Sequence, residues 1–481
     1  MRVLALVLLL TAAPLWEAFR IAAFSNGDIW WHLRTGLWIL QNHRVPRNGL
    51  FSQYATMPWV ASSWAFEALV ASTYQWLGLK AFPALLMGFE VVFAGVLFLL
   101  AGGWRRKFWI AILLSAAVLY VEVDLQPLPI LFSILFFGIE LMLLLQSRRR
   151  GDVNLLYWLP PLFFLWANFH MQFVNGLLLL ALYVLAEIVE RWIHSSGHGS
   201  YSPRGYSVAK VLAIACFSAI ATLLTPYGFH LFNAFSSVYS KVLFKYFAEM
   251  YAFSFRRPQD FVALLLVMAA FLALGRQRSR DLFKIGVMVV FAMLAFRVQR
   301  DVWCVLLPSI AVISDAVADA GREDARSGRF ERWNLEKMLA MALALFVLVL
   351  AVKVRVPSNE VLMKRAARVL PIKACDYIRT NHLPGPLFNA FNWGGFLIWY
   401  LPEYPVAIDS RQNLYNDELD RNLKVTEGTE RLEDDPGFVR AQTILLERNS
   451  GMAKALTTLP VLRAQFHMVY EDDIAVILTR Q

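Results

Sequence analysis

The chain has 481 residues, of which 58% are hydrophobic and only 17% are charged, and its formal net charge is +10. A soluble protein of this length carries about a quarter charged residues and lacks long apolar runs. Here such runs recur, for example "LALVLLLTAAPLW" and "MLAMALALFVLVLAV". Several approach the roughly 20 residues that cross a hydrocarbon core. The composition therefore excludes an ordinary soluble protein and predicts a polytopic membrane protein.

The apolar runs predict about eleven membrane-spanning helices separated by polar loops. We expect these helices near residues 3–24, 81–101, 108–121, 128–146, 155–168, 173–190, 209–224, 260–274, 283–297, 302–319 and 338–354. A cleaved signal peptide is the alternative interpretation of the first run, although "TAAPLWEAF" lacks a convincing A-x-A cleavage site.

Basic residues concentrate in alternate loops of this arrangement. Five loops together carry 18 Lys and Arg residues, namely "GGWRRK", "SRRRG", residues 191–210, "GRQRSRDLFK" and "GREDARSGRFERWNLEK". The positive-inside rule places these loops in the cytoplasm. The N-terminus is then cytoplasmic, the residues after Lys353 are extracytoplasmic, and the chain lies in the inner (cytoplasmic) membrane. The positive charge is thus a topology signal, and no nucleic-acid partner is predicted.

The first outer loop, residues 25–80, contains two amphipathic pieces. They are "DIWWHLRTGLWILQ" and "WVASSWAFEALVASTYQWLG", separated by the break "VPRNGLF". Their tryptophans predict helices that lie in the aromatic belt of the membrane interface. Trp30, Trp31 and Trp59 have two interpretations, stacking on sugar faces or anchoring the loop in lipid, and anchoring is favoured.

The composition changes near residue 355. Residues 355–481 contain 15 basic and 16 acidic residues, which is typical of a soluble domain. Their pattern predicts strands at 385–391, 404–411 and 441–447, helices at 393–402 and 450–459, and a hairpin at 466–480 that turns at 471–473. We therefore predict a transmembrane helical domain, residues 1–354, followed by an extracytoplasmic α/β domain, residues 355–481.

The first amphipathic piece carries the leading catalytic candidate. Asp28, Trp31 and His32 follow an i, i+3, i+4 spacing, so a helix places them on one face. A carboxylate beside an imidazole and an indole ring can activate a nucleophile or bind a sugar. The alternative is that Asp28 only caps the helix. Glu67, in the second piece, is a further candidate for binding substrate.

Other polar candidates fall at the predicted outer ends of the spans. They are His170, Arg297, Arg300 and Asp301 as substrate-binding candidates, and Glu122 and Asp124 as metal ligands. Arginines suit a phosphate group, and an acidic pair suits a hard divalent cation such as Mg²⁺ or Mn²⁺. Helix ends in the headgroup layer, with Arg297 pairing with Asp301, are the alternative interpretation. No cofactor is required by these motifs.

Five stretches of the sequence resemble a known group of proteins. They are "DIWWHLRTGLWILQNHRVPRNGLFS", "PWVASSWAFEAL", "WANFHMQFVNGLLL", "TPYGFHLF" and "FNWGGFLIWYLPEYPVAIDSRQNLYN". Together they are similar to bacterial polytopic membrane proteins assigned to the glycosyltransferase C (GT-C) superfamily. The resemblance runs in patches over nearly the whole chain.

The resemblance implies a function and roles for several residues. GT-C enzymes transfer a sugar from a polyprenyl-phosphate or pyrophosphate carrier to an extracytoplasmic acceptor, usually with inversion, and an acid in the first outer loop activates the acceptor. Asp28 occupies that position. "EVD" at 122–124 resembles the acidic motif of a second outer loop, although many members work without metal. "FNWGGF" at 391–396 is similar to an acceptor-binding motif only in part, because Gly394 stands where that motif has an Asp.

The sequence supports two classes of function. The first is a membrane-embedded glycosyltransferase that uses a polyprenyl-phosphate-linked sugar, an extracytoplasmic acceptor and Asp28 as the base. The second is a non-catalytic protein of polysaccharide or lipid export or of envelope assembly, including a GT-C member that has lost activity. Turnover of lipid-linked sugar separates the two classes.

Overall fold

A computed structural model describes residues 1–20, 26–103, 107–195, 205–238, 241–319, 342–347, 349, 357–415 and 417–481. The chain divides into two compact units. Unit 1 comprises Met1–Ile21, Pro83–Gly228 and Tyr246–Val356, and unit 2 comprises Ala22–Phe82, Phe229–Lys245 and Pro357–Gln481. Residues of the first predicted outer loop therefore belong to the same unit as the C-terminal residues.

Unit 1 is built from long apolar helices. They are α1 (Arg2–Arg20), α4 (Ala81–Leu100, from Pro83 on), α5 (Phe108–Val121), α6 (Ile130–Arg150), α7 (Leu159–Phe169), α8 (Phe173–Ser195), α9 (Val208–Ala221), α12 (Pro258–Arg276), α13 (Leu282–Arg297) and α14 (Trp303–Asp319). Their buried faces are apolar, with Phe137 packing edge-to-face on Phe291 and Trp303. The prediction of a mostly helical membrane protein is confirmed.

The predicted number of eleven spans is not confirmed. Within the described residues, four helical stretches are long and apolar enough to cross a membrane: Trp64–Leu100, Ile130–Arg150, Phe173–Ile193 and Pro258–Arg276. Two shorter apolar helices, Phe108–Val121 and Val208–Ala221, have 14 residues each. That is fewer than the roughly 20 residues that span a hydrocarbon core. Most of the last predicted span, 338–354, lies outside the described residues.

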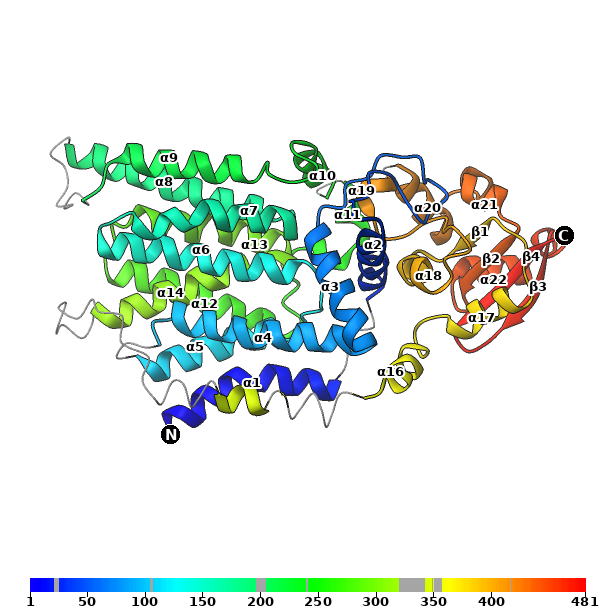
Figure 1. Ribbon diagram of the computed structural model, residues 1–481, viewed down its shortest axis with the longest axis horizontal. Helices are drawn as coiled ribbons and strands as arrows, with labels where there is room; N and C mark the ends of the chain where they lie inside the picture. The colour runs from blue at the N-terminus through cyan, green and yellow to red at the C-terminus, as the bar shows by residue number, and fades with distance from the viewer. Residues whose placement is uncertain are drawn as a thin grey trace. The chain divides into compact units, whose positions relative to one another are not determined.

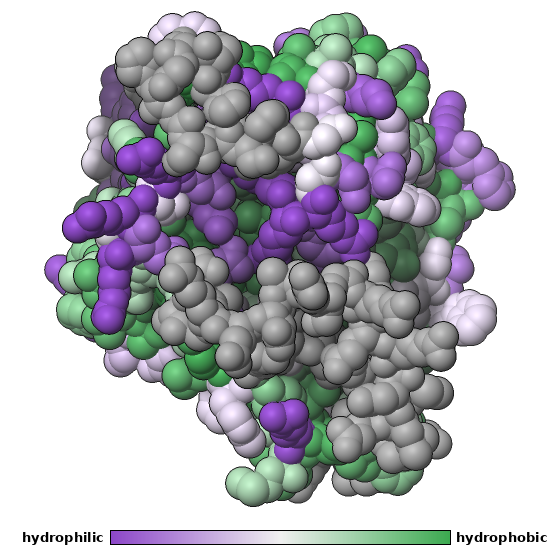
Figure 2. All heavy atoms as spheres, turned by 90° about the vertical axis from the view of Figure 1, so that its left-hand side faces the viewer, coloured by the Kyte–Doolittle hydropathy of each residue, from purple (hydrophilic) through white to green (hydrophobic). Residues whose placement is uncertain are grey.

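Successive helices of unit 1 run in opposite directions (Figure 1). The C-terminal end of α6, the start of α13 and the end of α14 therefore share one end of the unit. Figure 2 looks onto this end and shows hydrophilic side chains gathered there. The opposite end carries the α5–α6 and α7–α8 connections and the residues that follow α13.

The hydrophilic end of unit 1 contains a buried ion-pair network. Arg148 at the end of α6 donates to Glu187 (2.9 Å) and Glu190 (2.6 Å) of α8 and lies 3.1 Å from Asp281. Arg191 approaches Glu187 at 3.8 Å. One guanidinium therefore links α6, α8 and the start of α13.

Unit 2 contains a four-stranded sheet of order β1-β2-β4-β3. The strands are β1 (Leu387–Asn389), β2 (Thr443–Glu447), β3 (Phe466–Glu471) and β4 (Ala475–Arg480). β1 is parallel to β2, and the other pairs are antiparallel, with Leu387 opposite Thr443 and Ile444 opposite Leu478. The small C-terminal sheet and its closing hairpin are thus confirmed.

Unit 2 also contains short helices. They are α16 (Asn359–Ala366), α17 (Ile372–Thr380), α18 (Gly394–Tyr400), α19 (Gln412–Tyr415), α20 (Asp417–Glu427), α21 (Pro436–Arg440), α22 (Gly451–Thr458) and α23 (Pro460–Arg463). A core of buried side chains, including Phe388, Phe438, Ile444, Leu456 and Leu478, fills the space between strands and helices.

The predicted strand at residues 404–411 is wrong. This segment forms only one isolated bridge, between Val406 and Ser52. Gln53 donates its backbone N–H to the Val406 carbonyl (2.9 Å), and Val406 donates to the Phe51 carbonyl (3.1 Å). The apolar run predicts a strand from the sequence alone. In the structure the segment lies beside the irregular residues around Ser52, so no regular ladder of hydrogen bonds forms.

The first outer loop contributes two helices to unit 2, α2 (Asp28–Asn42) and α3 (Trp64–Leu77), and residues 229–245 contribute α10 (His230–Val238) and most of α11 (Lys241–Tyr246). Both amphipathic pieces of the loop are thus helical. The apolar side of α2 packs inside the unit, where Trp30 contacts Phe396 and Trp399 with ring centroids 5.2 and 4.7 Å apart.

The predicted lipid-anchoring role of the loop tryptophans is wrong for Trp30 and Trp59. Trp30 is fully buried and Trp59 is 3% exposed. A side chain enclosed by protein cannot insert into the membrane interface. The two rings instead bury apolar area within unit 2, to which large aromatic residues contribute strongly.

Candidate active site

Asp28 is the first residue of α2 and is half-buried. Its backbone N–H donates to the Asn26 side chain (2.7 Å), which fixes the start of the helix. The Ser410 hydroxyl donates to Asp28 Oδ1. Ser410 Oγ in turn accepts a hydrogen bond from Trp31 Nε1 at 3.0 Å. The predicted catalytic acid therefore contacts a residue that follows it by 382 positions.

The other predicted residues of α2 and α3 lie beside this group. His32 Nδ1 is 3.1 Å from Glu67 Oε1, and both side chains are buried. The Trp31 and His32 rings lie 3.6 Å apart, and Trp59 packs against Trp31 with centroids 6.1 Å apart. Four predicted site residues, Asp28, Trp31, His32 and Glu67, therefore come together in unit 2.

Ser410 is flanked by a buried ion pair. Arg411 donates to both oxygens of Asp409, at 2.9 and 2.7 Å, and both side chains are fully buried. Tyr415 also donates to Asp409. Although burial lowers the pKa of Arg411, the Asp409 carboxylate outweighs it and the pKa is raised. Burial, with the Asp409 charge, raises the pKa of Tyr415 well above its usual value. Arg411 thus stays charged and Tyr415 stays neutral.

In unit 1, His170 follows α7 and contacts Ser133 of α6. Ser133 Oγ lies 2.7 Å from His170 Nδ1 and accepts from Trp166 Nε1, also at 2.7 Å. Burial, together with the nearby Arg300 charge, lowers the pKa of His170 to about 3. His170 is therefore neutral at physiological pH, so it offers a hydrogen bond rather than a positive charge.

Arg300 and Asp301 follow α13 at the same end of unit 1. Gln172 donates to Asp301 Oδ1 at 2.7 Å, and Arg300 Nε lies 3.8 Å from that oxygen. Arg300 also donates to Glu249 at 3.2 Å. Arg297, the last residue of α13, is exposed. Arg297 is therefore accessible from the surface, whereas a phosphate that binds Arg300 would compete with the carboxylates of Glu249 and Asp301.

The predicted metal ligands Glu122 and Asp124 come after α5, with Glu122 half-buried and Asp124 exposed. Burial raises the pKa of Glu122 to about 8, although Arg257 opposes this shift. Their role as metal ligands stays a prediction. Across the described ranges, no three His, Cys, Asp or Glu side chains gather where a metal ion would bind. We therefore derive no reaction step that uses a metal.

Close backbone packing at the start of α18 explains why the sequence "NWGG" has two glycines there. A Cβ at Gly394 would lie 2.2 Å from the Ile408 carbonyl oxygen, and one at Gly395 would lie 2.2 Å from the Gly27 carbonyl oxygen. Both contacts are far shorter than van der Waals separations, so only glycine fits. Gly394 therefore permits close packing where an aspartate side chain has no space.

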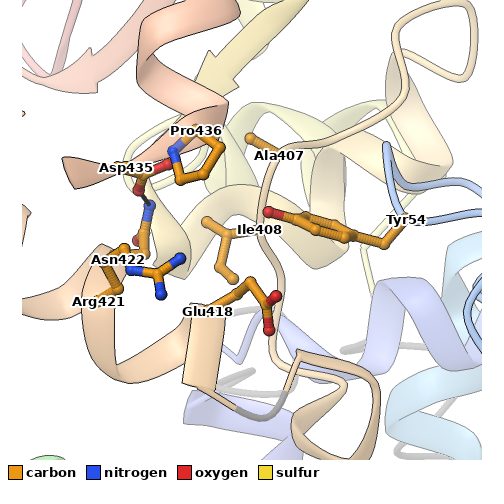
Figure 3. Close-up of a pocket in the computed structure, with 8 residues that line it drawn as sticks. All are labelled: Tyr54, Ala407, Ile408, Glu418, Arg421, Asn422, Asp435 and Pro436. Atoms are coloured by element: carbon orange, nitrogen blue, oxygen red, sulfur yellow. Dashed lines mark hydrogen bonds between the residues drawn. The ribbon is translucent and has the colours of Figure 1, made fainter. Parts of the chain in front are cut away.

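A small pocket in unit 2 involves none of the predicted site residues (Figure 3). Its lining comprises Tyr54, Ala407, Ile408, Glu418, Arg421, Asn422, Asp435 and Pro436. Asn422 donates to Asp435 at 2.8 Å, and Asp435 caps α21 through the N–H groups of Gly437 and Phe438. The buried polar pair is thus explained by helix capping, and we assign the pocket no function.

Sequence reasoning missed Ser410, Asp409 and Arg411. The segment "VAIDSR" has an apolar start and was interpreted as a strand. An apolar run that ends in an Asp and an Arg two positions apart is the signal that marks this segment. Its contact with Asp28 has no local signature, because the two segments are joined only in the tertiary structure.

Comparison with known proteins gives a likeness to a solved structure. No family model matches the sequence, and no curated protein sequence matches it. Among solved structures, the chain is similar to the oligosaccharyltransferase of the archaeon Archaeoglobus fulgidus, which was crystallised with a tethered acceptor peptide containing the NVT sequon. The TM-score is 0.55 and the identity is 10%, over 100% of this chain and 74% of that chain. This likeness shows a GT-C-like membrane fold.

Proposed function

We propose that the protein is an integral-membrane glycosyltransferase that moves a sugar from a polyprenyl-phosphate carrier to an extracytoplasmic acceptor. The acceptor is a glycan, a lipid or a protein. The likeness to an oligosaccharyltransferase over the whole chain carries this proposal. The presence of Asp28 at the start of α2, in the position that the superfamily uses for its acid, supports it.

Asp28 acts as the general base in this proposal. Its carboxylate accepts the proton of an acceptor hydroxyl within hydrogen-bond reach. The hydroxyl oxygen attacks the anomeric carbon and forms the new glycosidic bond, while the bond from that carbon to the carrier phosphate breaks. The phosphate leaves with the electron pair. A single displacement of this kind inverts the anomeric configuration.

Arg297 and His170 are the candidate donor-binding residues in this proposal. Arg297 is exposed at the end of α13, where a guanidinium can form two hydrogen bonds to a phosphate. Charge that develops on the leaving phosphate is offset by such a group. His170 is neutral and therefore suits a hydrogen bond to a hydroxyl group of the donor.

The test compares wild type with Asp28→Asn. The purified protein in nanodiscs is incubated with polyprenyl-phosphate hexoses, polyprenyl-phosphate pentoses and polyprenyl-pyrophosphate oligosaccharides, each with a mixture of envelope glycans and peptides. Released carrier lipid is then measured. We expect wild type to release it and Asp28→Asn to lose at least roughly 100-fold in rate, because a positioned base contributes about 10²–10⁴.

Asp473→Asn is the matched control, since Asp473 is exposed on the turn between β3 and β4. This variant should keep the wild-type rate. If Asp28→Asn still released carrier lipid at the wild-type rate, Asp28 would not be the base. Binding of lipid-linked sugar without release by wild type, for every donor, would contradict the proposal and favour the non-catalytic export or scaffold class.

A further inference from the structure

A chain of two hydrogen bonds ends on Asp28. Trp31 Nε1 donates to Ser410 Oγ at 3.0 Å, and Ser410 donates to Asp28 Oδ1. Trp31 and Asp28 both belong to α2, one turn apart, whereas Ser410 follows α18. The serine thus bridges the first turn of a helix from outside that helix.

The chemistry of the three groups fixes the direction of this chain. An indole N–H is a donor only, so Ser410 must accept from Trp31 through a lone pair. The single hydroxyl hydrogen of Ser410 is then directed to the Asp28 carboxylate. Linked hydrogen bonds polarise one another, so the Trp31 bond makes Ser410 a better donor. The arrangement therefore stabilises the ionised form of Asp28, which is the form a base requires.

Buried neighbours hold Ser410 in this position. Arg411 and Asp409, on either side of it, form a bidentate ion pair that is fully buried. Arg411 also donates to the Leu50 carbonyl at 2.6 Å, and its guanidinium carbon lies 4.9 Å from the centre of the Trp59 ring. Because both neighbours of Ser410 are held by these contacts, its backbone and Cβ are held beside Asp28.

The start of α2 is held against the same region. Gly395 approaches the Gly27 carbonyl so closely that a Cβ on Gly395 would lie 2.2 Å from that oxygen and 3.0 Å from Trp31 Cδ1. Gly27 directly precedes Asp28. The backbone of Gly395 therefore packs directly against the residue before Asp28, and this close packing restrains the start of α2 beside α18.

We propose that Ser410 is a positioning residue that orients the Asp28 carboxylate and keeps it ionised. The inference rests on the proposed function, in which Asp28 is the base. Charged and titratable groups on the surrounding elements include His32 and Arg34 on α2, Glu67 on α3, and Asp409 and Arg411 beside Ser410. His32 pairs with Glu67, Arg411 pairs with Asp409, and the Ser410 hydroxyl donates to Asp28 Oδ1.

The first arm of the test measures turnover of lipid-linked sugar as a function of pH. We expect Ser410→Ala to lower kcat roughly tenfold with KM changed by less than about twofold, since a hydrogen bond to a charged group is lost. Loss of a donor to the ionised carboxylate moves the acid limb of the profile upward by about one pH unit. Ser410→Thr, which keeps the hydroxyl, should restore the wild-type profile.

The second arm measures the protonation of Asp28 by a method that does not depend on enzymatic turnover. Water-soluble carbodiimide with glycine ethyl ester modifies protonated carboxyl groups, and mass spectrometry of the peptide that contains Asp28 gives the rate at each pH. The pH midpoint of labelling should rise by about one unit in Ser410→Ala and less in Trp31→Phe. Ser72→Ala is the matched control, because Ser72 is exposed and bonds only to the Ala68 carbonyl of its own helix.

The outcomes separate this inference from the proposed function. If wild type has no turnover but Ser410→Ala raises the labelling midpoint, the proposed function fails and the role of Ser410 toward Asp28 stands. If Ser410→Ala leaves both the midpoint and the acid limb unchanged, the positioning role is overturned. Equal loss of activity in Ser410→Ala and Ser410→Thr, with an unchanged midpoint, would also overturn it, because that pattern indicates a packing role.

Discussion

Unit 1 packs long helices through apolar faces and has a buried ion-pair network at one end. In unit 2, a buried ion pair and close glycine contacts join the first outer loop to the C-terminal residues. Arg148 in unit 1 and Arg411 in unit 2 illustrate the contrast. Arg148 links helices that also share apolar faces. Arg411 connects Asp409 with the Leu50 carbonyl and the Trp59 ring, and so joins the first outer loop to the C-terminal residues.

This difference predicts that a single substitution of a contact residue reduces stability more in unit 2 than in unit 1. In unit 1, the loss of one polar contact leaves the apolar packing of the helices in place. In unit 2, the loop between α2 and α3 has little regular structure, so specific contacts with the C-terminal residues hold it. Three substitutions test this contrast, and we order them by expected effect.

The largest effect is expected for Arg411→Met. It leaves the Asp409 carboxylate buried without its bidentate partner, and breaking a buried pair in this way costs about 3–5 kcal/mol. We expect a large drop in thermal stability and rapid proteolysis within residues 43–58. The double variant Asp409→Asn/Arg411→Met should recover part of the loss, because no buried charge remains. If Arg411→Met were as stable as wild type, the proposed difference between the two units would be wrong.

A smaller effect is expected for Gly395→Ala. Its Cβ would lie 2.2 Å from the Gly27 carbonyl oxygen, and a backbone atom cannot rotate out of the way. We expect a loss of about 2–3 kcal/mol, at the upper end of typical overpacking. Gly451→Ala at the start of α22 is the control, since no atom lies within 4 Å of its Cβ. Calorimetry should show that control at or slightly above wild-type stability, and equal stability of both variants would argue against the close contact.

The smallest effect is expected for Arg148→Met. Glu187 keeps Arg191 at 3.8 Å and Asp281 keeps Lys284 at 3.9 Å, so two of the three carboxylates retain a basic neighbour. We expect a loss of roughly 2 kcal/mol in thermal unfolding, below the range for a buried pair with one partner. Arg149→Met, which removes a half-exposed pair with Asp315, should cost less than about 1 kcal/mol. A loss for Arg148→Met as large as for Arg411→Met would show that both units depend on their buried ion pair equally.

Local pattern predicted much of both units. The apolar runs predicted α4, α6, α8 and α12, because a helix in lipid must be apolar over its length. The i, i+3, i+4 spacing predicted α2 and placed Asp28 and Trp31 on one face. The hairpin of β3 and β4 followed from two runs containing β-branched or aromatic residues around an acidic turn. α17 and α20 were missed, since short helices in a polar segment give a weak periodic signal.

The sequence by itself determined that the protein is mostly helical and membrane-embedded, and that Asp28 stands at the start of an amphipathic helix. These properties depend on neighbours within one or two helical turns. The tertiary structure alone decided that Trp30 and Trp59 are buried, that residues 404–411 form no strand, and that Ser410 donates to Asp28. Contacts between residues 382 positions apart depend on how the whole chain packs, and no local pattern records them.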